Sequence, residues 1–525
     1  MPGLSTGLSA GSPVVVSGFY HELIVELVAI AAVALAVVVG AVAWRRLRGA
    51  PRAAVAAEPV ARCVVRVAFG AIWVFDGILQ AQASMPLAMV PQVVAPAAST
   101  SPGWVQAMVN WGGNLWNQHP ISVPASAVWI QLGIGIWLLV APRGWWSRAA
   151  GLVSLAWSVL VWALGEAFGG IFAPGLSWLT GAPGGVVFYA VAGLLVALPL
   201  TAWTPRLGRR LLAIYGSFLV AMALLQAWPG RGSWQGAGRH TTGNLTATLQ
   251  TMAGNSQPHW LASLIAASAR GVGAHGGAVN LVVVVLMTTS GVLLLTGRRT
   301  SVRAGVGVLV ALTLVDWVIV QDMGFWGGVG TDPNSMLPQA ILVVVGALAL
   351  RAAPSEAPAR VPRLAPLVTS AASLVAVGVL VVGSVPALAA SVAPAASPVL
   401  AEAAGGAARA LDRPVPAPVA ARMTSGSALL VEVGHCGART TWEVRIAASA
   451  AARWPTTVLV RGGCASLTVP AGFVRVSGPA RDAGSILVIH HGRERAAVEV
   501  RGPHSSALRS SYATVLVDAL VSSAR

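Results

Sequence analysis

Acidic and amide side chains interrupt the long apolar runs of this chain. Asp76 and Gln80 lie one helical turn apart near the end of the run 63–83, and Asp316 lies inside the run 303–321. An ionisable group in a membrane-spanning helix is costly unless it faces a bundle interior or a polar cavity. These residues therefore indicate proton binding beside a quinone-like or small anionic molecule. The alternative is that a hydroxyl or amide on a neighbouring helix satisfies each carboxylate.

Two apolar runs end in the same way. The first break is Trp162–Gly170, which carries Glu166, and the second is Trp317–Gly328, which carries Gln321 and Asp322. Each break is rich in glycine and places an acidic or amide group at the end of the run. The helix macrodipole disfavours a carboxylate at a helix C-terminus, so the position of Glu166 favours a functional role in a polar opening that faces the outer leaflet. The alternative is that these residues simply end a helix in water, at a glycine-rich turn.

The long segment between the runs 63–83 and 125–141 is rich in tryptophan. It holds Trp111, Trp116 and His119, and the corresponding later segment holds His240 and Trp260. Tryptophan gathers at membrane interfaces, so an aromatic belt is one interpretation. The other is a lid over a flat aromatic head group, with His119 and His240 exchanging protons near neutral pH.

Composition and run length define the elements that must position these residues. The chain has 525 residues, of which 56% are hydrophobic and 10% are charged. Apolar runs near 20 residues recur, which is the length that crosses a bilayer core of about 30 Å. We therefore predict a polytopic α-helical membrane protein with about ten transmembrane helices in the lipid bilayer. The predicted spans cover residues 22–44, 63–83, 125–141, 148–168, 184–202, 209–228, 278–296, 303–321, 336–351 and 366–391.

Arginines between the runs predict the orientation. They cluster after the first span and then in every second connection, for example Arg143 and Arg148, or Arg298 and Arg299. The positive-inside rule makes that side cytoplasmic, so the N-terminus and the C-terminal region are expected outside. Arginines placed as topology signals also argue against nucleic-acid binding, despite the net charge of +17.

A repeat of about 150 residues is visible within the helical part. Residues 68–80 align with 213–226, which sets Met222 against Asp76. Because each copy holds four spans, an even number, the copies share their orientation and are parallel repeats. The predicted parts are an anchor and arginine-rich linker at 1–60, four-helix units at 61–205 and 206–352, a linker with the tenth helix and a tether at 353–425, and a β-rich extracytoplasmic domain at 426–525.

The C-terminal region carries two cysteines, Cys436 and Cys464. In an oxidising compartment they favour a structural disulfide, which would stabilise the fold by about 3 kcal/mol. A redox-active pair is the alternative. A copper site is a further alternative, with His435, Cys436, His490, His491 and His504 as ligands. A His-Cys dipeptide is not the ligand spacing of a blue-copper loop, so no metal is predicted.

Three short motifs resemble the DoxX/DoxD family of four-helix membrane proteins. They are residues 73–80, 165–170 and 181–184, and the likeness is strongest over 60–202 and weaker over 208–351. The chain is most similar to the branch known as the thiosulfate:quinone oxidoreductase large subunit. That resemblance implies electron transfer from an external sulfur compound to quinone, with a small partner subunit. Asp76, Gln80 and Glu166 stand at matched positions.

The leading hypothesis is a membrane redox protein that couples oxidation of a small sulfur compound or thiol outside the membrane to quinone reduction. The sequence holds no haem, flavin or iron–sulfur motif, so electrons are expected to move through quinone, through thiols or through a partner protein. The expected partner is an extracytoplasmic redox or cell-envelope protein. The alternatives are a non-catalytic scaffold that presents its C-terminal domain to such a partner, and a small-molecule transporter. The predicted catalytic residues are Asp76, Glu166 and His119, and the predicted quinone-binding residues are Gln80, Trp73, Trp111, Trp116, Asp322 and Asp316.

The disulfide prediction can be tested in whole cells. Cys436 and Cys464 should resist a membrane-impermeant thiol reagent and react with it only after reduction, because a disulfide sulfur is not nucleophilic. Ready labelling without reductant would show that the cysteines are free.

Overall fold

The computed structural model describes residues 13–48, 55–238, 242–326, 329–351, 358–359 and 365–392, together with eight strand segments between 421 and 501. Two four-helix units make up most of the described part. The first consists of α2 (Val60–Gln80), α6 (Ser122–Val140), α7 (Gly144–Leu164) and α8 (Val186–Ala197), and the second of α9 (Pro205–Ala227), α11 (His259–Leu295), α12 (Arg299–Ile319) and α13 (Met336–Leu350).

Shorter elements connect these helices. Between α2 and α6 lie α3 (Met85–Met89), a π-helical turn (Val90–Val94), α4 (Ala95–Ala98) and α5 (Gly103–Gln118), and between α9 and α11 lies α10 (Asn244–Ala253). Two 3₁₀ turns, Ala167–Gly170 and Leu200–Ala202, flank α8. A two-residue strand β1 (Val55–Ala56) pairs with β2 (Pro358–Ala359) in antiparallel fashion.

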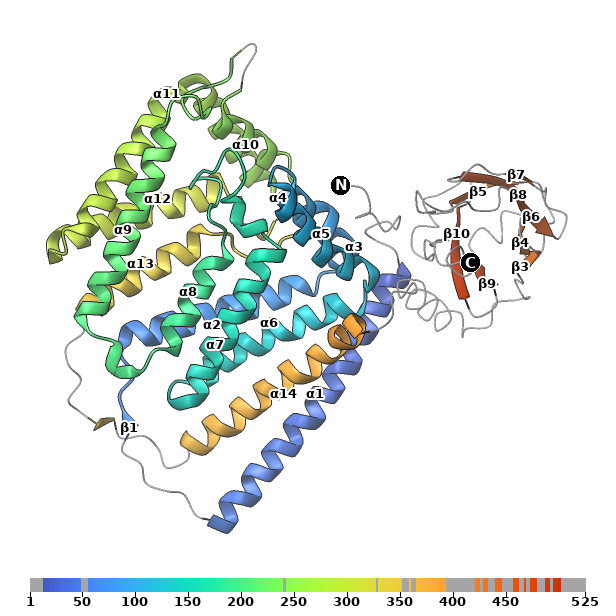
Figure 1. Ribbon diagram of the computed structural model, residues 1–525, viewed down its shortest axis with the longest axis horizontal. Helices are drawn as coiled ribbons and strands as arrows, with labels where there is room; N and C mark the ends of the chain where they lie inside the picture. The colour runs from blue at the N-terminus through green and yellow to red at the C-terminus, as the bar shows by residue number, and fades with distance from the viewer. Residues whose placement is uncertain are drawn as a thin grey trace.

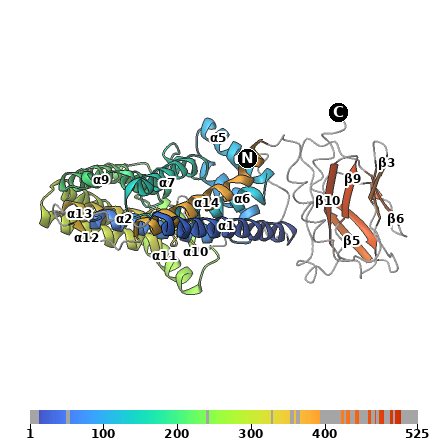
Figure 2. The same ribbon diagram turned by 90° about the horizontal axis from the view of Figure 1, so that it is seen from below.

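The two units share their helix contacts pair by pair. The packing of α2 on α6, α6 on α7, α7 on α8 and α2 on α8 is matched by α9 on α11, α11 on α12, α12 on α13 and α9 on α13. The units meet where α13 packs against α2 and α8. Figure 1 shows the helices as one slanted array, and Figure 2 shows α7 and α9 toward one face and α10 and α11 toward the other.

Close glycine crossings fix the alignment of the units. A Cβ added at Gly135 of α6 would lie 2.7 Å from the Gly70 carbonyl oxygen of α2, and one added at Gly291 of α11 would lie 2.8 Å from the Gly216 carbonyl oxygen of α9. Only glycine permits this approach of two helix backbones. Asp76 and Met222 each follow the α2 or α9 glycine by six residues, so they occupy equivalent places.

Eight described helices are long and apolar enough to cross a membrane. The predicted spans 184–202 and 336–351 are the exceptions, because α8 has 12 residues and α13 has 15. At 1.5 Å per residue these helices measure about 18 and 22 Å, short of the roughly 30 Å core. The structure thus supports eight of the roughly ten predicted spans, and a full crossing by α8 and α13, the fourth helix of each unit, remains a prediction.

α11 is longer than its predicted span. His275 has non-helical dihedral angles (φ −129°, ψ 32°) and divides the 37-residue helix into two arms. The arm after His275 matches the predicted span 278–296. The arm before it packs on α10, so this unit carries a helical extension beyond its membrane span.

Two helices flank the first unit. α14 (Ala365–Val392) packs on α6, and α1 (Pro13–Arg48) packs on α14, so both lie at one edge of the array (Figure 1). Pro386 lies inside α14, and the next amide, Ala387 N, donates a hydrogen bond to Ser126 Oγ of α6 at 3.0 Å. Proline interrupts a helix ladder, and here a neighbouring helix satisfies a backbone group beside the interruption.

A buried ion cluster ties together the helix ends of the first unit. Arg62 of α2 donates to Glu58 (2.6 Å), to the Val196 carbonyl at the end of α8 (2.9 Å) and to the Pro142 carbonyl (2.7 Å). Arg66 donates to Glu58 and to the last carbonyls of α6. Arginines placed at helix C-termini satisfy carbonyls that have no helical partner and oppose the negative end of the macrodipole. The sequence analysis did not identify this cluster.

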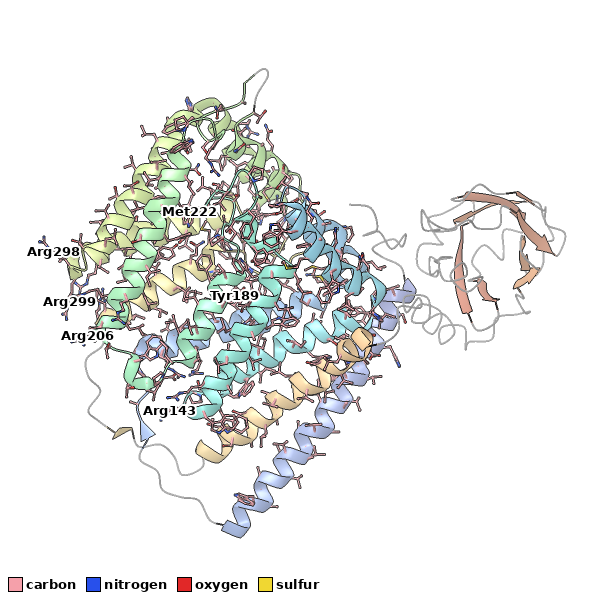
Figure 3. The ribbon with its side chains drawn as sticks, in the orientation of Figure 1. Arg143, Tyr189, Arg206, Met222, Arg298 and Arg299 are labelled. Carbon is pink, nitrogen blue, oxygen red and sulfur yellow. The ribbon has the colours of Figure 1, made fainter. Side chains whose placement is uncertain are left out.

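The arginines of the predicted topology loops lie along one edge of the helical body. Figure 3 labels Arg143, Arg206, Arg298 and Arg299 on that edge. This is the arrangement expected if the spans alternate in direction. Several apolar helices and this edge indicate a membrane protein; the compartment that each terminus occupies remains a prediction.

Beyond α14 the structure describes only strand segments. They are β3 (Ala421–Thr424), β4 (Ala428–Glu432), β5 (Thr440–Arg445), β6 (Thr457–Arg461), β7 (Leu467–Thr468), β8 (Phe473–Gly478), β9 (Leu487–His491) and β10 (Glu494–Arg501). Their pairing order is β7-β6-β4-β3-β9-β10-β5-β8. The connecting residues, Cys436 and Cys464 among them, lie outside the described residues. A folded β-rich extracytoplasmic domain and its disulfide therefore remain predictions.

The buried ion cluster predicts that replacing an arginine destabilises the protein much more in the first unit than at the equivalent end of the second. Replacing Arg62 with Met should lower the free energy of unfolding by about 3–5 kcal/mol, because it leaves buried carbonyls and part of a buried ion pair without a partner. Arg209→Met, at an exposed position in the equivalent first turns of α9, should cost less than about 1 kcal/mol. Denaturant unfolding in detergent measures both values. Equal losses would refute a structural role for the cluster.

Candidate functional site

The fourth helix of each unit begins inside the helical body and is capped there by a side chain. Glu166 accepts hydrogen bonds from the backbone amides of Gly185 (3.1 Å) and Val186 (3.3 Å) at the start of α8. Gln321 accepts one from Met336 N (3.4 Å) at the start of α13, and its amide donates to Ser335 Oγ (3.1 Å). A glutamate and a glutamine therefore do the same structural work at equivalent places.

The backbone beside each cap turns in the same unusual way. After Glu166, the residues Ala167 and Phe168 have φ of 49° and 59°, and after Gln321, the residues Asp322 and Met323 have φ of 51° and 55°. Positive φ is uncommon for residues other than glycine. In both copies the preceding tryptophan holds the returning chain, because the indole N–H donates to a proline carbonyl: Trp162 to Pro183 at 2.7 Å, and Trp317 to Pro333 at 2.8 Å.

Glycine completes both turns. Gly169 and Gly324 also have positive φ, and a Cβ on either would collide with the backbone of the returning chain. The echo between Trp162–Gly170 and Trp317–Gly328 in the sequence is thus a shared backbone motif that folds the chain back into the bundle.

Four ionisable groups gather beside the first cap. Asp76 of α2, Tyr189 of α8, Glu166 and Asp332 lie close enough to interact electrostatically. Asp332 comes from the second unit, where its carboxylate accepts hydrogen bonds from Thr331 Oγ1 (2.8 Å) and Asn334 N (2.7 Å). Asp76 Oδ1 and the Tyr189 hydroxyl have no hydrogen-bond partner of standard geometry among the described residues. We call these four residues the acidic cluster.

The equivalent place in the second unit carries no acid. Met222 stands for Asp76 and Gln321 for Glu166. Gln339 stands for Tyr189, because each is three residues after the capped amide, and Ala182 stands for Asp332, because each precedes the proline that accepts the indole bond. Figure 3 marks Tyr189 and Met222 in the interior of their units. One copy of a duplicated site is therefore acidic and the other is neutral.

In the second unit, the equivalent site is occupied by Gln339 and by two aromatic side chains that donate hydrogen bonds to it. Gln339 Oε1 accepts hydrogen bonds from Trp178 Nε1 (2.7 Å) and the Tyr215 hydroxyl (2.6 Å). Trp178 is fully buried and comes from the returning loop of the first unit, so it enters the core of the second unit. The returning loop of the second unit in turn contacts the first unit, because the Gly330 carbonyl of that loop accepts a hydrogen bond from Gln82 Nε2 at 3.0 Å. Each unit thus sends a loop onto the other.

Burial determines the protonation of the acidic cluster. Burial, followed by the neighbouring Asp332, raises the pKa of Glu166 to about 8, although the α8 amides oppose the shift. Burial also raises the pKa of Asp332, against its hydrogen bonds from Thr331 and Asn334. Carboxyl groups that share a buried site do not all ionise together, so the cluster retains protons at neutral pH.

The macrodipole argument for Glu166 was wrong. Although this residue follows the C-terminus of α7, its carboxylate lies at the N-terminus of α8, where the macrodipole favours negative charge. The prediction considered only the helix that precedes the residue in sequence. Glu166 therefore has a structural role as a cap, and any functional role must come in addition to it.

The predicted tryptophans and His119 have different surroundings. Trp73 is buried in the core, where it donates to Ser154 Oγ at 2.9 Å and meets the Tyr189 ring edge-on at 4.8 Å. Trp111 on α5 is 65% exposed. Trp116 donates to the Pro86 carbonyl at 3.1 Å, and His119 is a buried residue at the end of α5. These tryptophans do not surround a single ring-binding site with Asp76.

The remaining predicted residues have separate environments. Gln80 is buried one turn beyond Asp76, with Oε1 unpartnered among the described residues. Asp316 is buried within α12, and no described group bonds either of its oxygens. Asp322 accepts a hydrogen bond from Asn255 at 3.4 Å, and burial raises the pKa of its carboxyl. His240 lies outside the described residues.

Aromatic side chains cover both turns. Trp104, Phe168 and Phe172 contact one another next to Trp162 in the first unit. In the second, Phe325 packs against Trp326 and against Phe75 of α2, with the Phe75 and Phe325 ring centroids 5.4 Å apart at a nearly perpendicular angle. Phe75 belongs to the first unit, is exposed, and contacts Phe325 of the second unit, so this pair marks a seam between the units.

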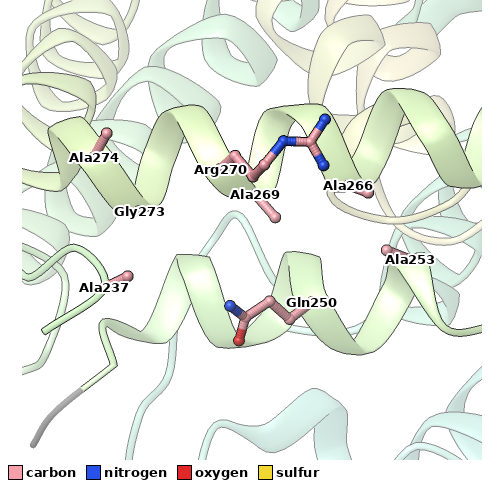
Figure 4. A pocket seen from close by; sticks show the side chains of 8 residues that line it. All are labelled: Ala237, Gln250, Ala253, Ala266, Ala269, Arg270, Gly273 and Ala274. Atoms are coloured by element: carbon pink, nitrogen blue, oxygen red, sulfur yellow. The ribbon is translucent and has the colours of Figure 1, made fainter. Parts of the chain in front are cut away.

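Two cavities lie away from the acidic cluster. One of about 470 Å³ is framed by α10 and α11; Figure 4 shows its alanine-rich lining with Gln250 and Arg270. The other, of about 300 Å³, lies between the returning loop of the first unit and the start of α10. None of the predicted catalytic residues lines either cavity. In the described part of the chain no group of three or more His, Cys, Asp or Glu residues could hold a metal ion.

Sequence reasoning missed Tyr189 and Asp332 as members of the cluster. Tyr189 lies in an uninterrupted apolar run, and Asp332 lies in the other unit, 166 residues after Glu166. The sequence signal that pointed to Asp332 was the repeat itself. Asp332 comes shortly after Trp317–Gly328, the segment that aligns with Trp162–Gly170, so the two returning segments could have been expected to meet between the copies.

Comparison of the chain with protein-family models, with curated proteins and with solved structures finds no match. The resemblance to the DoxX/DoxD family therefore remains an interpretation of the short motifs.

The cap predicts a pH-dependent effect of Glu166→Gln. A carboxyl whose pKa rises on folding destabilises the native state progressively between its unfolded pKa, about 4.5, and its folded pKa, about 8. Gln keeps an acceptor for the α8 amides, as Gln321 does for α13. The variant should match the parent protein in melting temperature at about pH 5 and exceed it at about pH 9.

The reverse substitution supplies the control. Gln321→Glu should lower the melting temperature increasingly as the pH rises, because it introduces a buried carboxyl. A loss of stability in Glu166→Gln that grows as the pH rises would contradict the account, since it would mean that the cap is stronger when the carboxyl is ionised.

Proposed function

We propose that this chain is a membrane redox protein of the DoxX/DoxD type, in which the acidic cluster exchanges protons during oxidation of a small sulfur compound or thiol and reduction of quinone. The observation that carries the proposal is the unequal duplication. Both units need the cap, and a neutral residue suffices for it in the second unit. The three carboxyls and the phenol that gather beside the first cap, Asp332 of the second unit among them, therefore exceed what the fold requires.

The chemistry of the proposed reaction makes use of proton-binding groups. Two thiols that form a disulfide release two electrons and two protons, and a quinone that becomes a quinol takes up two of each. Carboxyls poised near neutral pH are suited to such transfers. Glu166, whose pKa lies near 8, would hold and release the proton, and Asp76 and Tyr189 would extend its path into the bundle.

Quinone enters this proposal as a substrate. The tryptophans predicted to hold its ring do not converge on Asp76, so we place its approach elsewhere. The seam where Phe75 meets Phe325 is exposed at Phe75 and adjoins the loop that carries Asp332. Aromatic edges suit a flat ring. The proposal also keeps a β-rich domain at 426–525, outside the membrane with the N-terminus, as the partner-binding part.

A non-catalytic scaffold is the second candidate. Its support is that Glu166 already has a structural role and that Trp73 is fully packed in the core. In that case the twin bundle would hold the C-terminal region for an extracytoplasmic partner, and the acidic cluster would serve only to join the units.

Turnover by the purified chain separates the two candidates. In liposomes that contain quinone, the protein should oxidise thiosulfate or a thiol, and Asp76→Asn and Glu166→Gln should each lower kcat by about a hundredfold, since they remove proton-transfer groups. Met222→Leu, at the position equivalent to Asp76, should leave kcat unchanged. Absence of turnover in the parent protein would favour the scaffold.

A further inference from the structure

The smaller cavity combines features of an anion site. It has a volume of about 300 Å³ and is formed by residues 175–180 of the first unit and by the end of α9 and the start of α10 in the second. Its polar lining includes Ser177, Thr180, Gln226, Arg231, Asn244 and Thr248. Neither Asp nor Glu is among the lining residues, so the charge of this cavity is positive.

Arg231 is held in place with donors to spare. One of its terminal nitrogens donates to the Leu176 carbonyl at 2.7 Å, and Asn244 Nδ2 donates to the Arg231 carbonyl at 2.5 Å. The ion pairs found in the described chain both involve Glu58, at the arginine-rich end. A guanidinium has five N–H donors in a planar fork that matches a carboxylate or phosphate. The remaining donors of Arg231 are thus available to a ligand.

The start of α10 adds to the positive field. Asn244, Leu245, Ala247 and Thr248, which line the cavity, belong to the first turns of this ten-residue helix. Its N-cap residue is Gly243, which has no side chain that could accept a bond from the first amides. The positive end of a helix macrodipole favours an anion, and here it meets the guanidinium at the same cavity.

The volume and the mixed lining indicate the size of the occupant. Because a water molecule takes up about 30 Å³, the cavity could hold the equivalent of roughly ten waters, more than an inorganic oxyanion fills. Leu176, Leu179 and Leu245 provide apolar surface next to the hydroxyls of Thr180 and Thr248. This lining suits an anionic head with a short carbon body.

We propose that this cavity binds a small organic anion, with Arg231 pairing with its carboxylate or phosphate group. The site bridges the units, because Ser177 of the first donates to Gln226 of the second at 2.9 Å along its wall. A bound anion would therefore hold the returning loop of the first unit against α10. The proposal is independent of proton exchange at the acidic cluster.

Calorimetric titration of the purified full-length chain tests the site. The probes are succinate, glycerol 3-phosphate and inorganic phosphate. At least one organic probe should bind saturably, and Arg231→Gln should weaken it by about tenfold or more, the loss expected for a charge-assisted pair. Arg270→Gln, at the other cavity, is the matched control and should leave the affinity unchanged.

A second variant keeps the test decisive if Arg231→Gln does not fold. Thr180 is exposed, so Thr180→Glu should retain the parent melting temperature while its carboxylate repels the anion and abolishes binding. Absence of binding by both organic probes, equal effects of Arg231→Gln and Arg270→Gln, or inorganic phosphate binding as tightly as the organic probes would each overturn the proposal.

Discussion

A helix that begins inside a membrane bundle must find acceptors for its first amide groups, and this requirement shapes the molecule. Water is absent there, and each unsatisfied amide costs several kcal/mol. The short helices α8 and α13 meet the requirement in the same way, with the side chain of Glu166 or Gln321 as acceptor. To bring that side chain into place, the chain turns through left-handed residues and is fastened by a tryptophan. The returning loops then lie close enough to enter the neighbouring unit.

The duplication separates what the fold needs from what it does not. Capping, the tryptophan bond and the glycine crossings occur in both units, so they belong to the architecture. The acids occur at one of the two equivalent sites. At the other, Gln339 is bonded by Trp178 and Tyr215 and the space is packed. The buried cluster around Arg62 is similarly confined to the first unit, where the equivalent position in α9 is Gly208, packed directly against the end of α13. The first unit thus concentrates the charged interactions, and the second is built mainly by apolar packing.

The sequence was informative where one local pattern determined the structure. Apolar runs located the helices, and the shared Trp–acid or Trp–amide break aligned the copies. The alignment of residues 68–80 with 213–226 paired Asp76 with Met222. It failed where distant segments meet. Asp332 joins Glu166 across the unit boundary, and Arg62 binds carbonyls of α6–α7 and α8, contacts that no local period encodes. The two short helices were predicted as spans because each lies in an apolar run, 184–202 or 336–351, and both helices start within two residues of the predicted start. The sequence did not show that these starts lie inside the helical body, because the returning loop and its capping side chain put them there.

The central claim is that a buried carboxyl at position 166 carries a proton at neutral pH, and infrared spectroscopy of the purified protein tests it directly. A protonated carboxyl has a carbonyl stretching band that is separate from that of a carboxylate. We predict such a band in the parent protein, lost on titration with a midpoint near pH 8 and missing from Glu166→Gln. A spectrum in which no carboxyl titrates above neutral pH, or in which Glu166→Gln retains the same band, would contradict the account.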